Sequence, residues 1–281
     1  MKPYQFRLFI PFVFKLLSVL SFIPPKAIYM LMNCIIVYLT ILVYYHFLNE
    51  YFENTVTNLF LAPIIIYPMV WNYILLNQTF QYYDLCAVLF FLLGLYFIIN
   101  GNFKLFLIVF VLGLFNKESA VYLIFAYLLF NYKSIFKPKI IINTVILAVI
   151  FIAVKSLLAF IFRNNEGATF ELGLPVNIDI IKNIFRNRIY AKNISLSFGG
   201  LYIFALLLFI SGRWKKFPDL KLVFVNLAVV PYLLLGIFLI YFTEVRVYAE
   251  LIPMFTTLFV IYLSTFEKLQ LKPRVQVIEQ G

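Results

Sequence analysis

Long runs of apolar residues, separated by a few polar or charged positions, recur along the whole chain and limit what it can fold into. A helix needs about 20 predominantly apolar residues to cross the roughly 30 Å hydrocarbon core of a membrane. Inside that core every backbone polar group must bond within the protein, and a helix does this by itself. We therefore expect about ten helices, at approximately residues 8–23, 28–48, 58–77, 85–99, 102–115, 118–132, 140–161, 194–211, 222–241 and 249–265.

The composition indicates a lipid environment. Hydrophobic residues make up 64% of the chain, charged residues 12%, and the mean hydropathy is +0.97, so the chain lacks the polar side chains to cover itself in water. A membrane barrel would show short segments of alternating polarity, whereas these runs are apolar on all sides. The sequence predicts an all-α fold, a polytopic helical membrane bundle of about nine to ten crossings over residues 1–265, followed by a polar, loose cytoplasmic tail at 266–281.

The first apolar segment carries a lysine, Lys15, near its middle. A lysine at mid-bilayer costs about 2.5 to 3.5 kcal/mol, so the segment either spans the membrane at that cost or lies in the interface. A spanning helix puts Arg7 in the cytoplasm. An interfacial helix leaves about nine crossings and puts Arg7 on the far side. The sequence is compatible with both arrangements.

Clusters of lysine and arginine predict the orientation, because cations in short loops stay on the cytoplasmic side. Three basic connections each lie two crossings from the next, and taking them as cytoplasmic also puts the C-terminus and the loop at 49–56 there. Their cations are Lys133, Lys137 and Lys139, then Arg213, Lys215, Lys216 and Lys221, then Lys268, Lys272 and Arg274. The non-cytoplasmic side then receives residues 78–84, 116–119, 162–192 and 242–249.

The net charge of +11 follows largely from such loops, which meet anionic lipid headgroups on the cytoplasmic side of a membrane. We therefore expect membrane lipids as partners and no nucleic acid.

The stretch FNKESAVYL, residues 115–123, places Lys117 and Glu118 between two apolar runs. As one helix, residues 102–132 would measure about 46 Å at about 1.5 Å per residue, too long for one crossing. We expect a break at Asn116, with Glu118 and Ser119 opening the second helix, where a carboxylate and a serine suit the first turn. Because each half is short for a full span, the turn should lie below the membrane surface in a recess.

Ionisable residues from three helix ends fall on the same predicted side. Ionisable groups set into membrane helices are candidates for function. The alternative is structural: a polar hairpin turn, or ion pairs that fix helices to one another. The candidate residues are Asp84, Lys117, Glu118, Glu244, Arg246 and Glu250.

Several short motifs accompany these residues. A Tyr83-Asp84 pair opens a predicted helix, and N-K-E-S at 116–119 fits the pattern N-[KR]-E-[ST]. The early segment PYQFRLFIPFVFKLL, which contains Arg7, is similar to P-[FY]-x-[YF]-R-x-L-x-P. The pattern E-x-R-x-[FY]-x-E-L-x-P is matched by Glu244, Arg246, Tyr248, Glu250, Leu251 and Pro253.

In these motifs the chain resembles the bacterial polytopic membrane proteins related to the GT-C glycosyltransferases, over most of its length from Pro3 to about Leu263. The resemblance implies a GT-C-like bundle in the bacterial inner (plasma) membrane. It also implies transfer of a sugar from a polyprenyl-phosphate donor to an acceptor on the non-cytoplasmic face. The family's first helix and the luminal loop with its catalytic acid are expected to be missing, since residues 3–7 correspond to the segment that follows them.

The chemistry of sugar transfer suggests roles for the candidate residues. Asp84 or Glu118 could take the proton of the acceptor hydroxyl as the catalytic base. Lys117 or Arg246 could stabilise the departing lipid phosphate, and we place Arg7 in the same substrate-binding group. Glu244 and Glu250 could orient Arg246 or hold a divalent cation.

Two other classes of function remain open. A non-catalytic membrane subunit of a cell-envelope or polysaccharide assembly would explain the missing first helix. A lipid or solute transporter would also carry ionisable residues in broken helices, although transporters usually bind near the midplane between repeated halves. The charged residues here gather toward one face, and no internal repeat is evident.

Overall fold

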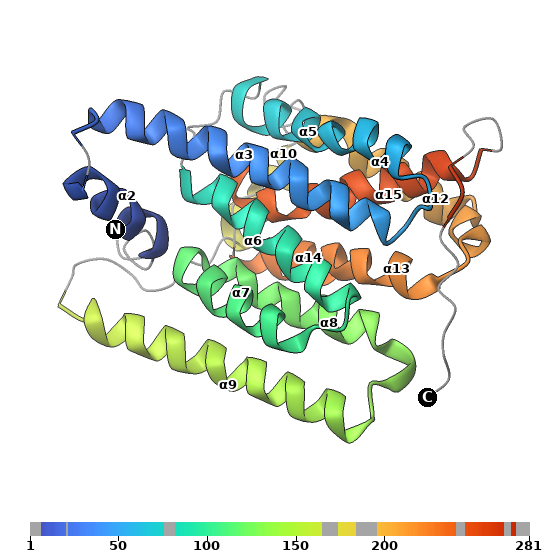
Figure 1. Ribbon diagram of the computed structural model, residues 1–281. Helices are drawn as coiled ribbons and strands as arrows, with labels where there is room; N and C mark the ends of the chain where they lie inside the picture. The colour runs from blue at the N-terminus through green and yellow to red at the C-terminus, as the bar shows by residue number, and fades with distance from the viewer. Residues whose placement is uncertain are drawn as a thin grey trace.

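A computed structural model of the protein describes residues 7–20, 22–75, 82–164, 174–183, 196–239, 245–266 and 271–273, and every named element in these ranges is helical (Figure 1). Labels with η mark 3₁₀ segments, except η2, which is π-helical. The elements are α2 (Phe9–Leu20), α3 (Pro25–Asn49), α4 (Thr55–Leu61), η1 (Ala62–Ile65), α5 (Ile66–Val70), η2 (Trp71–Leu75), α6 (Tyr82–Ile99), α7 (Phe103–Asn116), η3 (Glu118–Tyr122), α8 (Leu123–Phe130), η4 (Tyr132–Ser134), α9 (Pro138–Ile161), α10 (Leu174–Asn183), η5 (Ser197–Gly200), α12 (Leu201–Ile210), η6 (Arg213–Lys216), α13 (Leu220–Phe224), η7 (Val225–Ala228), α14 (Val229–Leu239), η8 (Val245–Leu251) and α15 (Ile252–Ser264).

Each of the ten segments predicted to be helical contains a helix in the described part of the chain, so the all-α prediction is confirmed. Three helices, at Pro25–Asn49, Thr55–Tyr73 and Pro138–Ile161, are long and apolar enough to cross a membrane. The other apolar helices have 10 to 17 residues. The two longest begin with a proline, which tolerates the first helical position because the N–H it lacks would have no partner there.

The helices run nearly parallel to one long axis, and α6 lies at the centre of the bundle (Figure 1). α3 and α7 flank α6, and α9 packs on the far side of α7 at the edge of the bundle. Residues 83–92 of α6 are all buried, as expected for a helix that is apolar all round. The core is therefore built around α6, whose first turn carries Asp84.

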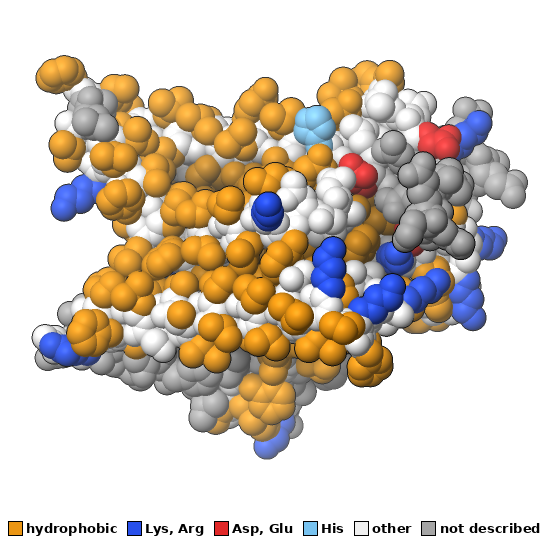
Figure 2. Space-filling view, turned by 60° about the horizontal axis from the view of Figure 1, so that its bottom comes forward, with side chains coloured by type: hydrophobic (Ala, Val, Ile, Leu, Met, Phe, Trp, Pro, Cys, Tyr) orange, Lys and Arg blue, Asp and Glu red, His pale blue; other side chains and the backbone are white. Residues whose placement is uncertain are grey.

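α9 touches the bundle along one narrow line of side chains. Its buried residues are Ile140, Leu147, Val154 and Leu158, which recur at the spacing of one helix face. The opposite face exposes large apolar side chains such as Val149 and Ile152. Figure 2 shows hydrophobic side chains covering much of the surface between the two ends. Apolar patches this extensive are rare on water-soluble monomers and favour a lipid environment.

α2 is short for a membrane crossing. Its 12 residues span about 18 Å at about 1.5 Å per residue, which is less than the thickness of a hydrocarbon core. It packs against α3, α6 and α7 and lies apart from the main axis of the bundle (Figure 1). Its length together with its position off the main axis and Lys15 near its middle favours the interfacial arrangement.

The connections predicted to be cytoplasmic meet at one end of the bundle. The ring of Tyr132 lies 4.8 Å from that of Phe224, which joins the α8–α9 turn to α13. Phe52, after α3, lies 6.0 Å from Phe217, and the Glu53 N–H donates to the Lys272 carbonyl at 3.1 Å. Lysines and arginines gather at this end in Figure 2.

The tail was predicted to be loose, and of its residues 267–281 the structure describes 271–273, which pack against the loop after α3. Leu271 is buried, and Pro273 forms an antiparallel bridge with Phe52. These residues pack because the tail contains an apolar side chain that the loop after α3 can cover.

Candidate functional site

The chain breaks at Asn116, as predicted. α7 ends there, Lys117 is extended with φ −160° and ψ 135°, and η3 begins at Glu118. The Asn116 amide donates to the Tyr83 carbonyl of α6 at 2.9 Å, which fixes the break against the central helix. A β-carbon added to Gly113 would lie 3.1 Å from the β-carbon of Ala120. The glycine therefore lets α7 and η3, the two sides of the hairpin around Lys117, approach closely.

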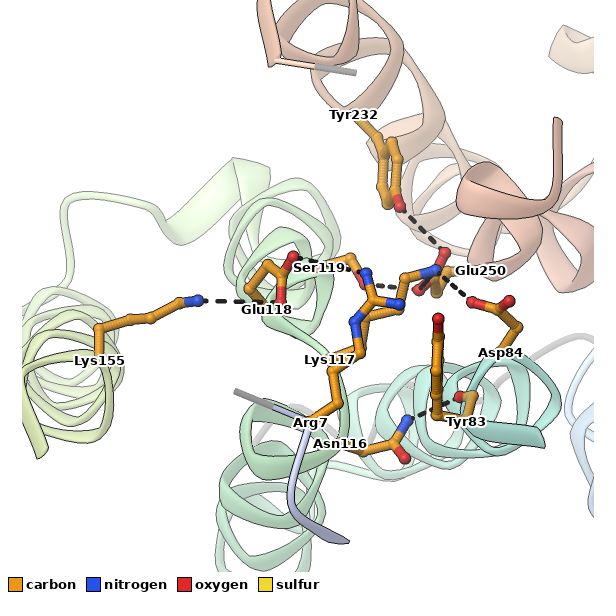
Figure 3. A network of polar contacts seen from close by, with 10 residues as sticks. All are labelled: Arg7, Tyr83, Asp84, Asn116, Lys117, Glu118, Ser119, Lys155, Tyr232 and Glu250. Atoms are coloured by element: carbon orange, nitrogen blue, oxygen red, sulfur yellow. Dashed lines mark hydrogen bonds and ion pairs between the residues drawn. The ribbon is translucent and has the colours of Figure 1, made fainter. Parts of the chain in front are cut away.

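Lys117 turns into the core and meets two carboxylates. Its Nζ lies 3.1 Å from Asp84 Oδ1 and 2.9 Å from Glu250 Oε1 (Figure 3). All three residues are at most 2% exposed. We call Asp84, Lys117 and Glu250 the buried triad. It joins α6, the break after α7, and η8.

Glu250 is held by two further groups. The Ser119 hydroxyl donates to Glu250 Oε1 at 2.5 Å, and the Tyr232 hydroxyl of α14 donates to Glu250 Oε2 at 3.0 Å (Figure 3). A buried carboxylate is tolerated when it is paired and hydrogen-bonded. These contacts meet that requirement for Glu250.

Glu118 points the other way and meets two cations. Its Oε1 lies 3.8 Å from Arg7 Nη2, and its Oε2 lies 3.8 Å from Lys155 Nζ of α9. The Glu118 side chain is 40% exposed and that of Lys155 30%. We call Arg7, Glu118 and Lys155 the outer triad.

Arg7 connects the two triads. Its guanidinium lies 4.2 Å from the centre of the Tyr83 ring, and the N–H of the next residue, Leu8, donates to the Phe115 carbonyl at 2.8 Å. Arg7 also attracts Asp84 and Glu250 electrostatically. When all six groups are ionised, the buried triad carries one net negative charge and the outer triad one net positive charge, so the six are neutral together.

The network lies short of the helix ends. Lys155 precedes Ile161, the last residue of α9, by six positions, or about 9 Å at about 1.5 Å per residue. Figure 1 shows α9 and α3 extending beyond the end of α7. This geometry fits the recess expected for the turn.

An apolar groove of about 470 Å³ lies between α2 and the end of α7. One lining residue, Leu8, directly follows Arg7 in the chain, and another, Phe115, directly precedes Asn116. Its lining residues are Leu8, Phe9, Pro11, Phe12, Lys15 and Phe115.

The structure brings together five of the seven predicted site residues: Arg7, Asp84, Lys117, Glu118 and Glu250. Glu244 and the side chain of Arg246 lie outside the described residues. Within the described part of the chain, Glu250 bonds Lys117, and no group of three or more His, Cys, Asp or Glu is placed to hold a metal ion. The divalent cation, predicted through Glu244 and Glu250, stays a prediction.

Sequence reasoning missed three members of the network. Lys155 carried a signal, because it is a lone charge inside the apolar run 140–161. Ser119 belonged to the N-K-E-S motif but received no role beyond opening a helix. Tyr232 had no signal, since it is one of 20 tyrosines in the chain.

No protein-family model, curated protein or solved structure matches the chain, so its resemblance to the GT-C glycosyltransferases stays a prediction from the motifs.

Proposed function

We propose that the protein is a multi-pass membrane glycosyltransferase of the GT-C type, which transfers a sugar from a polyprenyl-phosphate donor on the non-cytoplasmic face. One observation carries the proposal. Residues from four separate motifs of the predicted family, Arg7, Asp84, Lys117 with Glu118, and Glu250, meet in one charged network. Motifs that matched by chance would not be expected to converge in space.

The proposed topology has about nine crossings in the bacterial plasma membrane, with α2 in the interface and the C-terminus in the cytoplasm. The basic end of the bundle then faces the cytoplasm, which agrees with the distribution of cations. The network lies toward the other end, where a lipid-linked donor would present its sugar.

We assign the base to Glu118. It is 40% exposed on its side chain, so an acceptor hydroxyl can reach it, whereas Asp84 is 2% exposed and bonded to Lys117. Asp84 and Glu250 are then positioning residues that hold Lys117.

The reaction balances with these roles. Glu118 takes the proton of the acceptor hydroxyl while its oxygen forms a bond to the anomeric carbon. The bond from that carbon to the lipid phosphate breaks, and the phosphate leaves with the electron pair. Arg7 and Lys155 lie where they can stabilise the growing negative charge, with Lys117 behind them, and we expect Arg246 to contribute to the same phosphate site. A divalent cation, if one is required, would assist the phosphate.

The test is donor turnover by the purified full chain in nanodiscs. The assay measures polyprenyl phosphate released from donors that carry different labelled hexoses. We expect release with the parent chain and its loss in Glu118→Gln. Glu53→Gln, a matched exposed carboxylate at the opposite end, should keep the parental rate. Equal release by Glu118→Gln and the parent chain, or none by the folded parent with any donor, would contradict the proposal.

A second candidate is a non-catalytic subunit of a cell-envelope assembly. The buried triad favours it, because its ion pairs and hydrogen bonds satisfy one another and would join three segments without any substrate. The absence of turnover in a stable, folded protein would support this reading. A transporter fits less well, since the network lies toward one end of the bundle rather than near its midplane.

A further inference from the structure

The two triads differ in how tightly their charges are paired. In the buried triad the ammonium lies 2.9 and 3.1 Å from its carboxylates, within direct hydrogen-bonding distance. In the outer triad both cations lie 3.8 Å from Glu118, beyond that distance. Glu118 therefore attracts Arg7 and Lys155 by charge without a direct hydrogen bond to either.

The exposure of the triads differs in the same direction. Side chains of the buried triad are at most 2% exposed, whereas Glu118 is 40% and Lys155 30% exposed. Removing one partner of a buried ion pair leaves a charge without compensation, which is strongly unfavourable. A loosely held, partly exposed carboxylate can be displaced with far less loss. Any exchange of charge in this network should therefore occur at Glu118.

The geometry around Glu118 suits a phosphate. Arg7 approaches one carboxylate oxygen and Lys155 the other, so an anion with several oxygens in that position would reach both cations. A guanidinium binds phosphate oxygens in a bidentate way, and an ammonium binds them as a point charge.

The groove indicates that the anion carries an alkyl chain. Its lining is apolar apart from Lys15, and it begins at Leu8, directly after Arg7. Its volume of about 470 Å³ lies within the range of about 300 to 1,000 Å³ typical of small-molecule sites. A phosphate held by Arg7 and Lys155 could therefore place its chain along α2.

We propose that Glu118 is an exchangeable counterion, which an alkyl phosphate displaces from Arg7 and Lys155 while its chain occupies the groove along α2. The proposal deepens the function proposed above and rests on it for one consequence. Displaced from the two cations, the Glu118 carboxylate becomes available as a base only when the phosphate of the donor is bound.

The experiment is equilibrium binding of ³²P-labelled decyl phosphate to the full chain in phosphatidylcholine nanodiscs, with empty nanodiscs as the blank for partitioning. We expect saturable binding. Arg7→Gln and Lys155→Gln should each weaken it by about tenfold or more, as for the loss of a charge-assisted hydrogen bond. Lys139→Gln, at the opposite end of the same helix as Lys155, should leave binding unchanged.

The decisive variant is Glu118→Gln. Because it removes the competing counterion, it should strengthen binding several-fold. If Glu118 only holds helices together, its replacement should weaken binding or leave it unchanged. Thermal unfolding of each variant shows that it remains folded. If Arg7→Gln does not fold, Lys155→Gln on the edge helix replaces it. Unchanged or weaker binding by folded Glu118→Gln would overturn the proposal.

Competition separates the sources of binding. Inorganic phosphate should compete weakly and decanol should not compete. If inorganic phosphate matched decyl phosphate, the groove would have no role, and if decanol matched it, the cations would have none. Because no sugar is present, the outcome is independent of turnover. Tight binding with counterion exchange but no turnover would reject the glycosyltransferase and keep this site.

Discussion

Replacing Lys117 by methionine removes the ammonium that Asp84 and Glu250 share and keeps most of its volume. The two contacts, at 3.1 and 2.9 Å, each represent an attraction of about 5.5 kcal/mol at an effective dielectric constant of about 20. Burying the ammonium opposes this by several kcal/mol, and breaking a buried pair typically costs about 3 to 5 kcal/mol. We expect the free energy of unfolding of Lys117→Met to fall by about 4 kcal/mol.

The assay is thermal unfolding in detergent or nanodiscs. For a chain of this size about 2 to 4 °C corresponds to 1 kcal/mol, so the midpoint should fall by about 8 to 16 °C. The control is Lys139→Met, an exposed lysine at the basic end, which should change the midpoint by less than about 2 °C.

A charge-balanced double variant tests the reason for the loss. Lys117→Met with Glu250→Gln removes one cation and one anion, so the remaining groups of the network are neutral again. The double variant should be more stable than Lys117→Met alone, so its loss of stability should be smaller than the sum of the two single losses in a double-mutant cycle. A single variant as stable as the parent chain, or a double variant less stable than the single, would refute the reasoning.

Two further predictions concern the backbone and the orientation. Gly199 has a φ of +62°, and a β-carbon there would lie 2.4 Å from Tyr67 Cε1, whereas Gly101 has a φ of +66° with open space around it. Gly199→Ala should therefore lower the free energy of unfolding by at least about 1 kcal/mol more than Gly101→Ala, and equal losses in thermal unfolding would contradict the contact. In a chain with both native cysteines replaced by serine, Lys216→Cys should react with a membrane-impermeant maleimide only after the cells are opened, because the basic end is predicted to be cytoplasmic. Labelling in intact cells would show that the basic end lies outside the cytoplasm and would contradict the predicted orientation.

The helices could be predicted because their signal is local. Nearly every helix lies in an apolar run about as long as a helix, and polar residues mark where one run ends and the next begins. The break at Asn116 followed from length, since residues 102–132 are too long for one crossing and N-K-E-S interrupts their apolar pattern. The gathering of Asp84, Lys117 and Glu250 near one end followed from counting crossings.

The partners within the site could not be predicted in the same way. Counting crossings gives the depth of a residue and the side on which it lies, but not which helices are neighbours. Glu250 was expected to orient Arg246 or to hold a divalent cation, and nothing in the local sequence indicated that it also bonds Lys117 from another part of the chain. Lys155 and Tyr232 enter the network because α9 packs on α7 and α14 lies near η8, and neither arrangement is encoded in local spacing.

In the membrane topology proposed above, we expect the separation of charges in the outer triad to depend on the thickness of the bilayer, because α9 contacts the bundle along one line of side chains. α9 has 24 residues, or about 36 Å at about 1.5 Å per residue, which exceeds a typical hydrocarbon core of about 30 Å. A helix longer than the membrane adjusts by tilting, and one held along a single line of side chains resists tilting least. Because Lys155 lies on α9 and Glu118 on the hairpin after α7, we expect a thinner bilayer to change the separation of this ion pair.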